Sequence, residues 1–95
     1  MSWASKAIED LQEGLTVTIK PHGRSMEPRV ESGQEVFLEP VELEDLKKND
    51  VVLCKVKGNV YLHLVKQVAS GKVLIGNNKG RTNGWTSKVY GRTLL

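Results

Sequence analysis

The sequence predicts a single, mostly β domain with one short N-terminal helix. Polar and apolar residues alternate in several short runs separated by turn formers, and Gly58-Asn59 divides two apolar runs as in a tight hairpin. With 95 residues there is room for one domain. We expect a helical segment at residues 1–14 and a β-rich core at residues 15–95.

The predicted helix covers residues 3–13. Its apolar side chains stand at nearly helical spacing: Trp3, Ala7, Ile8 and Leu11. Ser5 can cap its start and Gly14 can end it. Residues 15–19 then alternate in polarity as a half-buried strand does, before Pro21 ends the run.

Further strands are predicted at residues 36–38, 51–57, 60–68, 72–75 and 88–94, with a connector at 40–50 and a polar loop at 76–87. If Gly58 and Asn59 form the hairpin loop, Cys54 lies opposite His63. On this register His63 projects from a largely apolar face, and Lys66 projects from the other face.

The charges divide unevenly between the two halves of the chain. Residues 1–50 hold all eleven acids and six bases, for a net charge of −5, whereas residues 51–95 hold eight bases and no acid, for +8. The second half, with Arg81, Trp85, Lys88 and Arg92, has the composition of a phosphate-facing surface. The more common arrangement, which we favour, is that the two halves pair their charges across the domain.

Composition also excludes several classes of protein. No apolar run approaches the ~20 residues that span a bilayer, and acids at positions 9, 10 and 13 occupy the place of an export signal. We therefore expect a cytoplasmic protein without a membrane partner. One cysteine and two histidines are too few for a disulfide or a structural zinc site, and we expect no metal or cofactor.

Two residues suggest chemistry, namely Ser25 in the loop HGRSMEP and His63 on the hairpin. A serine hydroxyl is a weak nucleophile that needs a base within hydrogen-bond reach, and neutral imidazole is available at pH 7. Gly23 and Pro28 would hold the loop in one shape, with backbone N–H groups free to face a developing oxyanion.

Other residues offer alternatives. Cys54 opposite His63 would form a Cys-His dyad, although a cysteine in the middle of a strand is more often a small buried hydrophobe. Lys66 is a rival base, but it leaves a regular strand on the wrong face unless a bulge intervenes. His22 is expected to be a loop residue, and Trp85 to cover the core or contact a partner.

Six blocks in order resemble the core of the LexA and signal peptidase superfamily of serine endopeptidases: GRSMEP, ESGQEVFLEP, KKNDVVLCKV, VYLHLVKQV, VLIGNN and VYGRTL. The resemblance covers about residues 15–95. It implies a LexA-like β fold, with the nucleophile at Ser25 and with Met26 and Pro28 matching the S-M-x-P box. Arg24, Met26 and Pro28 would then contact the substrate.

The same resemblance implies a general base on the strand after the hairpin, at His63. Most members have lysine there, and the archaeal and endoplasmic-reticulum signal peptidases have histidine. The Ser25 backbone N–H would hold the oxyanion. Where the related enzymes have a G-D-N box, this chain has Gly76-Asn77-Asn78, so that Asn77 or Asn78 would orient His63 in place of an aspartate.

These observations predict a soluble serine endopeptidase that cleaves an extended peptide or protein segment with a Ser25-His63 dyad. An inactive peptidase-like module that binds peptides or proteins is the first alternative. A nucleic-acid-binding β domain that uses residues 72–92 is the second.

Overall fold

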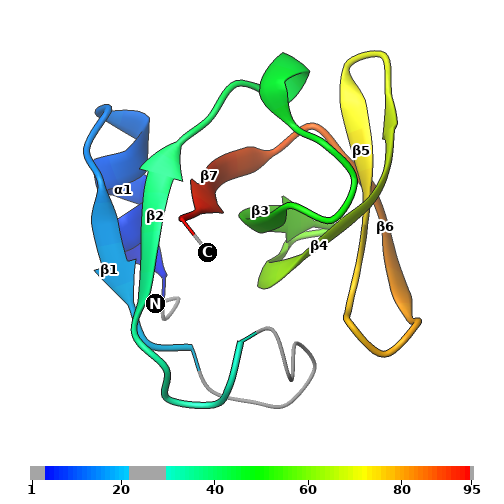
Figure 1. Ribbon diagram of the computed structural model, residues 1–95. Helices are drawn as coiled ribbons and strands as arrows, with labels where there is room; N and C mark the ends of the chain where they lie inside the picture. The colour runs from blue at the N-terminus through cyan, green and yellow to red at the C-terminus, as the bar shows by residue number, and fades with distance from the viewer. Residues whose placement is uncertain (1–3, 22–29, 95) are drawn as a thin grey trace.

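The computed structural model describes residues 4–21 and 30–94, and it confirms the mostly β fold with a short N-terminal helix. Seven strands form one antiparallel sheet in the order β1-β2-β7-β3-β4-β5-β6 (Figure 1). The elements are α1 (Ser5–Gln12), β1 (Val17–Ile19), β2 (Val36–Pro40), the 3-10 helix η1 (Leu43–Asp45), β3 (Val51–Val56), β4 (Asn59–Ala69), β5 (Lys72–Gly76), β6 (Thr82–Thr86) and β7 (Val89–Thr93).

The sheet coils on itself around β3 and β4. In Figure 1 the β5-β6 hairpin stands on one side of these strands, and α1, β1 and β2 stand on the other. The Thr86 hydroxyl on β6 donates a 2.6 Å hydrogen bond to the Lys55 carbonyl oxygen on β3, which brings the last strand back to the middle of the sheet. We call the face of β3 and β4 that lies inside this curl the inner face, and the opposite face the outer face.

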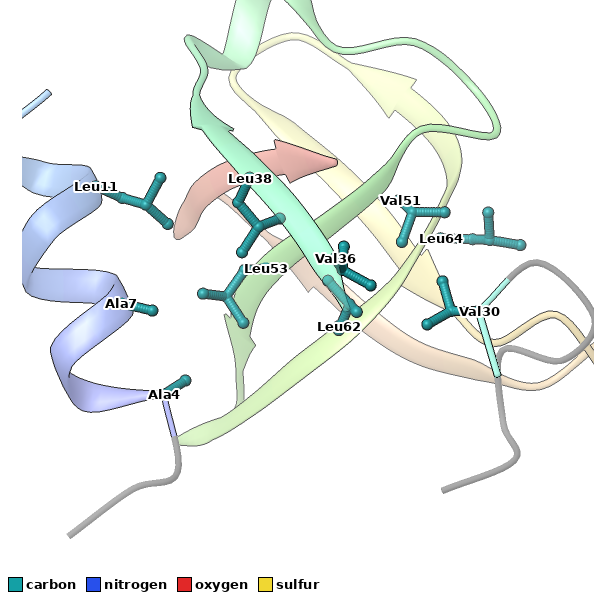
Figure 2. Close-up of a cluster of buried hydrophobic side chains, with 10 residues drawn as sticks. All are labelled: Ala4, Ala7, Leu11, Val30, Val36, Leu38, Val51, Leu53, Leu62 and Leu64. Carbon is teal, nitrogen blue, oxygen red and sulfur yellow. The ribbon is translucent and has the colours of Figure 1, made fainter. Parts of the chain in front are cut away.

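Two apolar cores are built on the two faces of β3 and β4. On the outer face, side chains of α1, β2, β3 and β4 meet those of the helix N-cap and of the segment before β2, as Figure 2 shows: Ala4, Ala7, Leu11, Val30, Val36, Leu38, Val51, Leu53, Leu62 and Leu64. On the inner face the core comprises Leu46, Val52, Cys54, Val56, Val65, Val73 and Ile75. Because side chains alternate along a strand, the two central strands serve both cores, and the predicted division of their residues between two faces is confirmed.

Helix α1 packs its apolar side on the sheet through Ala7 and Leu11, as the spacing predicts. Its N-cap is Ala4, without a side-chain hydrogen bond, so the prediction that Ser5 caps the helix is wrong. The chain leaves the helix through Gly14, whose φ of 86° lies in the left-handed region that favours glycine.

The register of the β3-β4 hairpin differs from the prediction by two residues. Its turn is centred on Lys57 and Gly58, with φ of 50° and 85°, which are the two positive values that a type I′ turn requires. Asn59 belongs to β4, and His63 lies opposite Val52, so the predicted pairing of Cys54 with His63 is wrong. A shift of two residues returns each side chain to its original face, which explains why the division of the β3 and β4 residues between two faces was still predicted correctly.

A further strand, β6, lies where a polar loop was predicted. Its residues Thr82–Thr86 pair with β5, and Leu74 lies opposite Trp85. The stretch contains asparagine and a glycine, Gly84, with φ of 135°, so neither its composition nor a clean alternation of polarity indicates a strand. Pairing with β5 is what forms it.

No helix in the described part of the chain has both the length and the apolar character that crossing a bilayer requires.

Candidate functional site

A cleft of about 1050 Å³ opens between α1, β1, the first half of β4 and the loop before β6. Its lining comprises Lys6, Ala7, Asp10, Thr16, Val17, Thr18, Ile19, Lys20, Pro21, Val30, Glu31, Val60, Tyr61, Leu62, His63, Asn77, Arg81 and Asn83. Strand β1 is the terminal strand of the sheet and contributes its whole length to this lining. The cleft therefore combines a sheet edge with a set of polar side chains.

His63 lines this cleft and is largely buried, with 9% of its surface exposed. Its Nδ1 lies 2.7 Å from Oδ1 of Asn83 on β6. The imidazole also stacks on Tyr61, two residues earlier on the same face of β4, with ring centroids 4.9 Å apart and the planes inclined by 23°. Two neighbours thus fix the position and the rotation of the ring.

The contact with Asn83 selects one tautomer of His63. An amide oxygen accepts hydrogen bonds and cannot donate them, so the hydrogen sits on Nδ1 and the lone pair on Nε2. Burial disfavours the imidazolium and lowers the pKa of His63 below its usual 6.5, while the hydrogen bond to Asn83 acts in the opposite direction with a smaller effect. At neutral pH His63 is therefore an uncharged imidazole, the form in which histidine accepts a proton.

The segment that carries the predicted nucleophile leaves and rejoins the described structure at this cleft. Pro21 and Val30, on either side of residues 22–29, both line it. The Gly33 N–H donates a 2.8 Å hydrogen bond to the Pro21 carbonyl oxygen, which ties the two ends together. Val30 is buried beside Val51 and Leu64 in the outer-face core (Figure 2).

The predicted site residues Ser25, Arg24, Met26 and Pro28 lie outside the described residues, as does His22. The described part of the predicted site is therefore His63, Asn77 and Asn78.

The residue on Nδ1 of His63 is Asn83, which no sequence motif indicated. Asn77 lines the same cleft, but its Oδ1 accepts the backbone N–H groups of Lys79 and Arg81, both at 2.9 Å, and so closes the β5-β6 loop. Asn78 follows it in this loop. Only the pairing of β6 with β5 brings Asn83 to His63, so no local motif could have identified it.

Cys54 has a different role from the one that a Cys-His dyad needs. It lies opposite Tyr61, its Sγ is 3.7 Å from the Tyr61 carbonyl oxygen, and burial raises its pKa to about 12. A thiol that stays protonated within an apolar core is a packing residue and not a nucleophile.

Lys66 sits in a bulge, because the register between β4 and β5 shifts from Val65 to Gln67. A Cβ atom on Gly76 would lie 2.9 Å from Lys66 Cε, so the lysine side chain passes over Gly76. Gly76 pairs with Leu64, and paired residues project to the same face. The bulge therefore leaves Lys66 on the outer face, away from His63.

Few of the bases in residues 51–94 are neutralised within the fold. Arg92 pairs with Glu39 at 3.6 Å and with Asp50 at 3.5 Å, and the remaining ion pair joins Lys6 to Asp10 in α1. Among the described residues the other seven bases of this half have no ion pair: Lys55, Lys57, Lys66, Lys72, Lys79, Arg81 and Lys88. Pairing of charges across the domain, which we had favoured, is thus confined to one arginine in the described structure.

Across residues 4–21 and 30–94, no three histidine, cysteine or carboxylate side chains gather in a way that could hold a metal ion. Comparison with protein-family models gives no match, and comparison with curated proteins gives no similar sequence. The resemblance to the LexA and signal peptidase superfamily therefore rests on the order of the six sequence blocks.

Proposed function

We propose that the protein is a serine endopeptidase in which Ser25 attacks the scissile carbonyl and His63 accepts its proton. The observation that carries this proposal is that His63 and both ends of the segment bearing Ser25 line one cleft. The motif order supports it independently, because it selects the same serine and histidine.

The chemistry of His63 suits a general base. The ring is uncharged at neutral pH, its tautomer leaves the lone pair on Nε2, and Tyr61 and Asn83 hold its plane. In the proposed reaction Nε2 removes the Ser25 hydroxyl proton as the acyl bond forms, and it then returns that proton to the leaving amine. A water molecule then takes the place of the serine hydroxyl: it attacks the acyl group as His63 accepts its proton, and Ser25 leaves with that proton. The Ser25 backbone N–H would face the oxyanion in both steps.

The shape of the cleft suits an extended peptide. Residues 16–20 run along it at the open edge of the sheet, where a peptide can add as a further strand through backbone hydrogen bonds. The side chains that alternate along such a peptide would meet the cleft wall at every second position.

One observation favours a second function, a peptide-binding module without turnover. The group on Nδ1 of His63 is an amide, and an amide stabilises the imidazolium of the transition state less than a carboxylate does. In this alternative the cleft and the edge of β1 hold an extended peptide, and Ser25 has no chemical role.

Cleavage of a diverse peptide pool by the purified protein, read by mass spectrometry, tests the proposal. We expect cuts that disappear in Ser25→Ala and persist in Ser70→Ala, an exposed serine in the β4-β5 turn that serves as a matched control. Circular dichroism establishes that each variant is folded.

Cuts that persist in Ser25→Ala would refute the proposed nucleophile. If the folded wild type makes no cuts, and peptides are instead retained equally by the wild type and Ser25→Ala, the protein is the binding module.

A further inference from the structure

The outer face of the β5-β6 hairpin carries an exposed aromatic residue among basic side chains. Trp85 has 43% of its surface exposed and lies opposite Leu74. On the same face, Lys72 precedes Leu74 by two residues and its Nζ lies 5.6 Å from the centroid of the Trp85 ring. We call the surface formed by Lys66, Lys72, Leu74, Gly76 and Trp85 the Trp85 face.

The other end of the Trp85 face is also basic. Lys66 extends over Gly76, two residues beyond Leu74 on β5. Lys79 and Arg81 are exposed in the loop that follows. These bases have no ion pair among the described residues, and residues 51–95 contain no acid.

Such a surface is complementary to an anion that also offers a flat apolar group. We propose that the Trp85 face binds single-stranded nucleic acid, with a base stacked on Trp85 and with Lys66, Lys72, Lys79 and Arg81 along the phosphates. A single strand fits better than a duplex, since only an unpaired base can present its ring face to the indole. Lys72 is exposed, so its ammonium group can pass from the indole to a phosphate when a base arrives.

Apart from Arg81, which also lines the cleft, this site is separate from the proposed peptidase site. The Trp85 face lies on the outside of the hairpin, whereas His63 lies on the inner face of β4 and is reached from the cleft. Binding of a nucleic acid here does not depend on cleavage, and we expect His63→Ala to retain it.

Fluorescence anisotropy of a labelled 20-nucleotide oligothymidylate, titrated with the full chain at several salt concentrations, tests the proposal. With four phosphate contacts, the slope of log affinity against log salt should be about −2.8, and Lys72→Ala should make it shallower by about 0.7. Trp85→Ala should weaken binding about tenfold, because it removes one stacked base.

Two variants serve as matched controls. Phe37→Ala removes an aromatic residue with 50% of its surface exposed at the other end of the sheet, and Lys48→Ala removes an exposed base from the acid-rich half. Neither should change the affinity by more than twofold. In a Trp3→Phe background Trp85 is the only tryptophan, and stacking should quench its fluorescence on titration with the unlabelled oligonucleotide.

Three outcomes would overturn the proposal. The first is a folded wild type that does not bind oligothymidylate at low salt, and the second is a Phe37→Ala variant that weakens binding as much as Trp85→Ala does. Binding to vesicles of anionic phospholipid without binding to oligothymidylate would assign the Trp85 face to a membrane surface instead.

Discussion

Strand β4 places two basic side chains three residues apart on opposite faces, and the fold treats them in opposite ways. His63 on the inner face is largely buried, stacked on Tyr61 and hydrogen-bonded to Asn83. Lys66 on the outer face lies in a bulge and extends over Gly76 towards the Trp85 face. The contrast shows how position in a sheet decides what a basic residue can do.

The physical reason lies in the solvation of the two groups. Burial favours the uncharged form of His63, and neighbours hold its ring in one orientation, so it can accept a proton at a defined place. Lys66 is half-buried and belongs to the half of the chain that contains no acid, where a positive charge is useful for holding an anion. One face of β4 thus supports our proposal of proton transfer, and the other supports our proposal of anion binding.

The largest effect expected from this comparison is the difference between His63→Ala and Lys66→Ala in peptide cleavage. Loss of a general base should lower kcat/KM by about 10²- to 10⁴-fold, whereas loss of Lys66 should change it by less than twofold. Steady-state cleavage of one peptide selected from the pool measures both effects. An equal loss in the two variants would show that Lys66 takes part in cleavage, and its placement on the outer face, away from His63, would then be wrong.

Gly76 lies beneath the Lys66 side chain on the outer face and should be intolerant of a side chain. A Cβ there would collide with the backbone carbonyl oxygen of Arg81 and would lie 2.9 Å from Lys66 Cε. We expect Gly76→Ala to lower the free energy of unfolding by about 3 kcal/mol, measured by urea denaturation.

Gly80→Ala in the following loop is the matched control for Gly76→Ala. At Gly80 φ is +90° and a Cβ would meet nothing within 4 Å. Alanine there should therefore lower the free energy of unfolding by only about 1 kcal/mol, the cost of a left-handed backbone. If Gly76→Ala were as stable as the wild type, the close approach of the Arg81 carbonyl oxygen and of Lys66 to Gly76 would be wrong.

The fold was predictable where local pattern and tertiary structure agree. The two faces of β3 and β4 follow from alternation of side chains, and a hairpin register that was wrong by two residues preserved them. Strand β6 was missed because Thr82–Thr86 lacks a run of β-branched residues, and its structure depends on pairing with β5. The predicted position of the β3-β4 turn was wrong because the turn places a lysine, Lys57, at positive φ, where asparagine and glycine are more usual.

The sequence indicated His63 as a candidate residue but did not indicate its neighbours in the fold. His63 was identifiable as a histidine on an apolar strand face within a recognisable motif order. Asn83 was not, because its contact with His63 joins residues twenty positions apart across a strand that the sequence did not indicate. The bases around Trp85 that have no ion pair within residues 4–21 and 30–94 are likewise a property of the folded chain, since the sequence favoured pairing of charges between the two halves.

The smallest effect that we predict concerns the Asn83 amide. Asn83→Asp places a carboxylate on Nδ1 of His63, and the opposite charge should raise the pKa of His63 from below 6.5 to above it. The acid limb of the pH-rate profile should move to higher pH with it. Because a carboxylate also stabilises imidazolium in the transition state, cleavage above pH 8 should rise severalfold. Proton NMR titration in a His22→Gln background, where His63 is the only histidine, measures the pKa directly.

The same substitution should reverse how stability depends on pH. In the wild type the pKa of His63 is lower in the folded than in the unfolded state, so the unfolded chain binds more protons and stability falls as pH drops below about 6.5. In Asn83→Asp the pKa of His63 is higher in the folded than in the unfolded state. The pair formed by the new carboxylate and His63 therefore adds to the free energy of unfolding at pH 5.5, and this contribution is lost as pH rises through the folded-state pKa. Asn77→Asp adds an equal charge to the same cleft at a residue whose Oδ1 binds backbone N–H groups, and it should leave the sign unchanged. Urea denaturation at pH 5.5 and pH 8 distinguishes the two variants. If the free energy of unfolding changed equally with pH in both, the residue at position 83 would not control the pKa of His63.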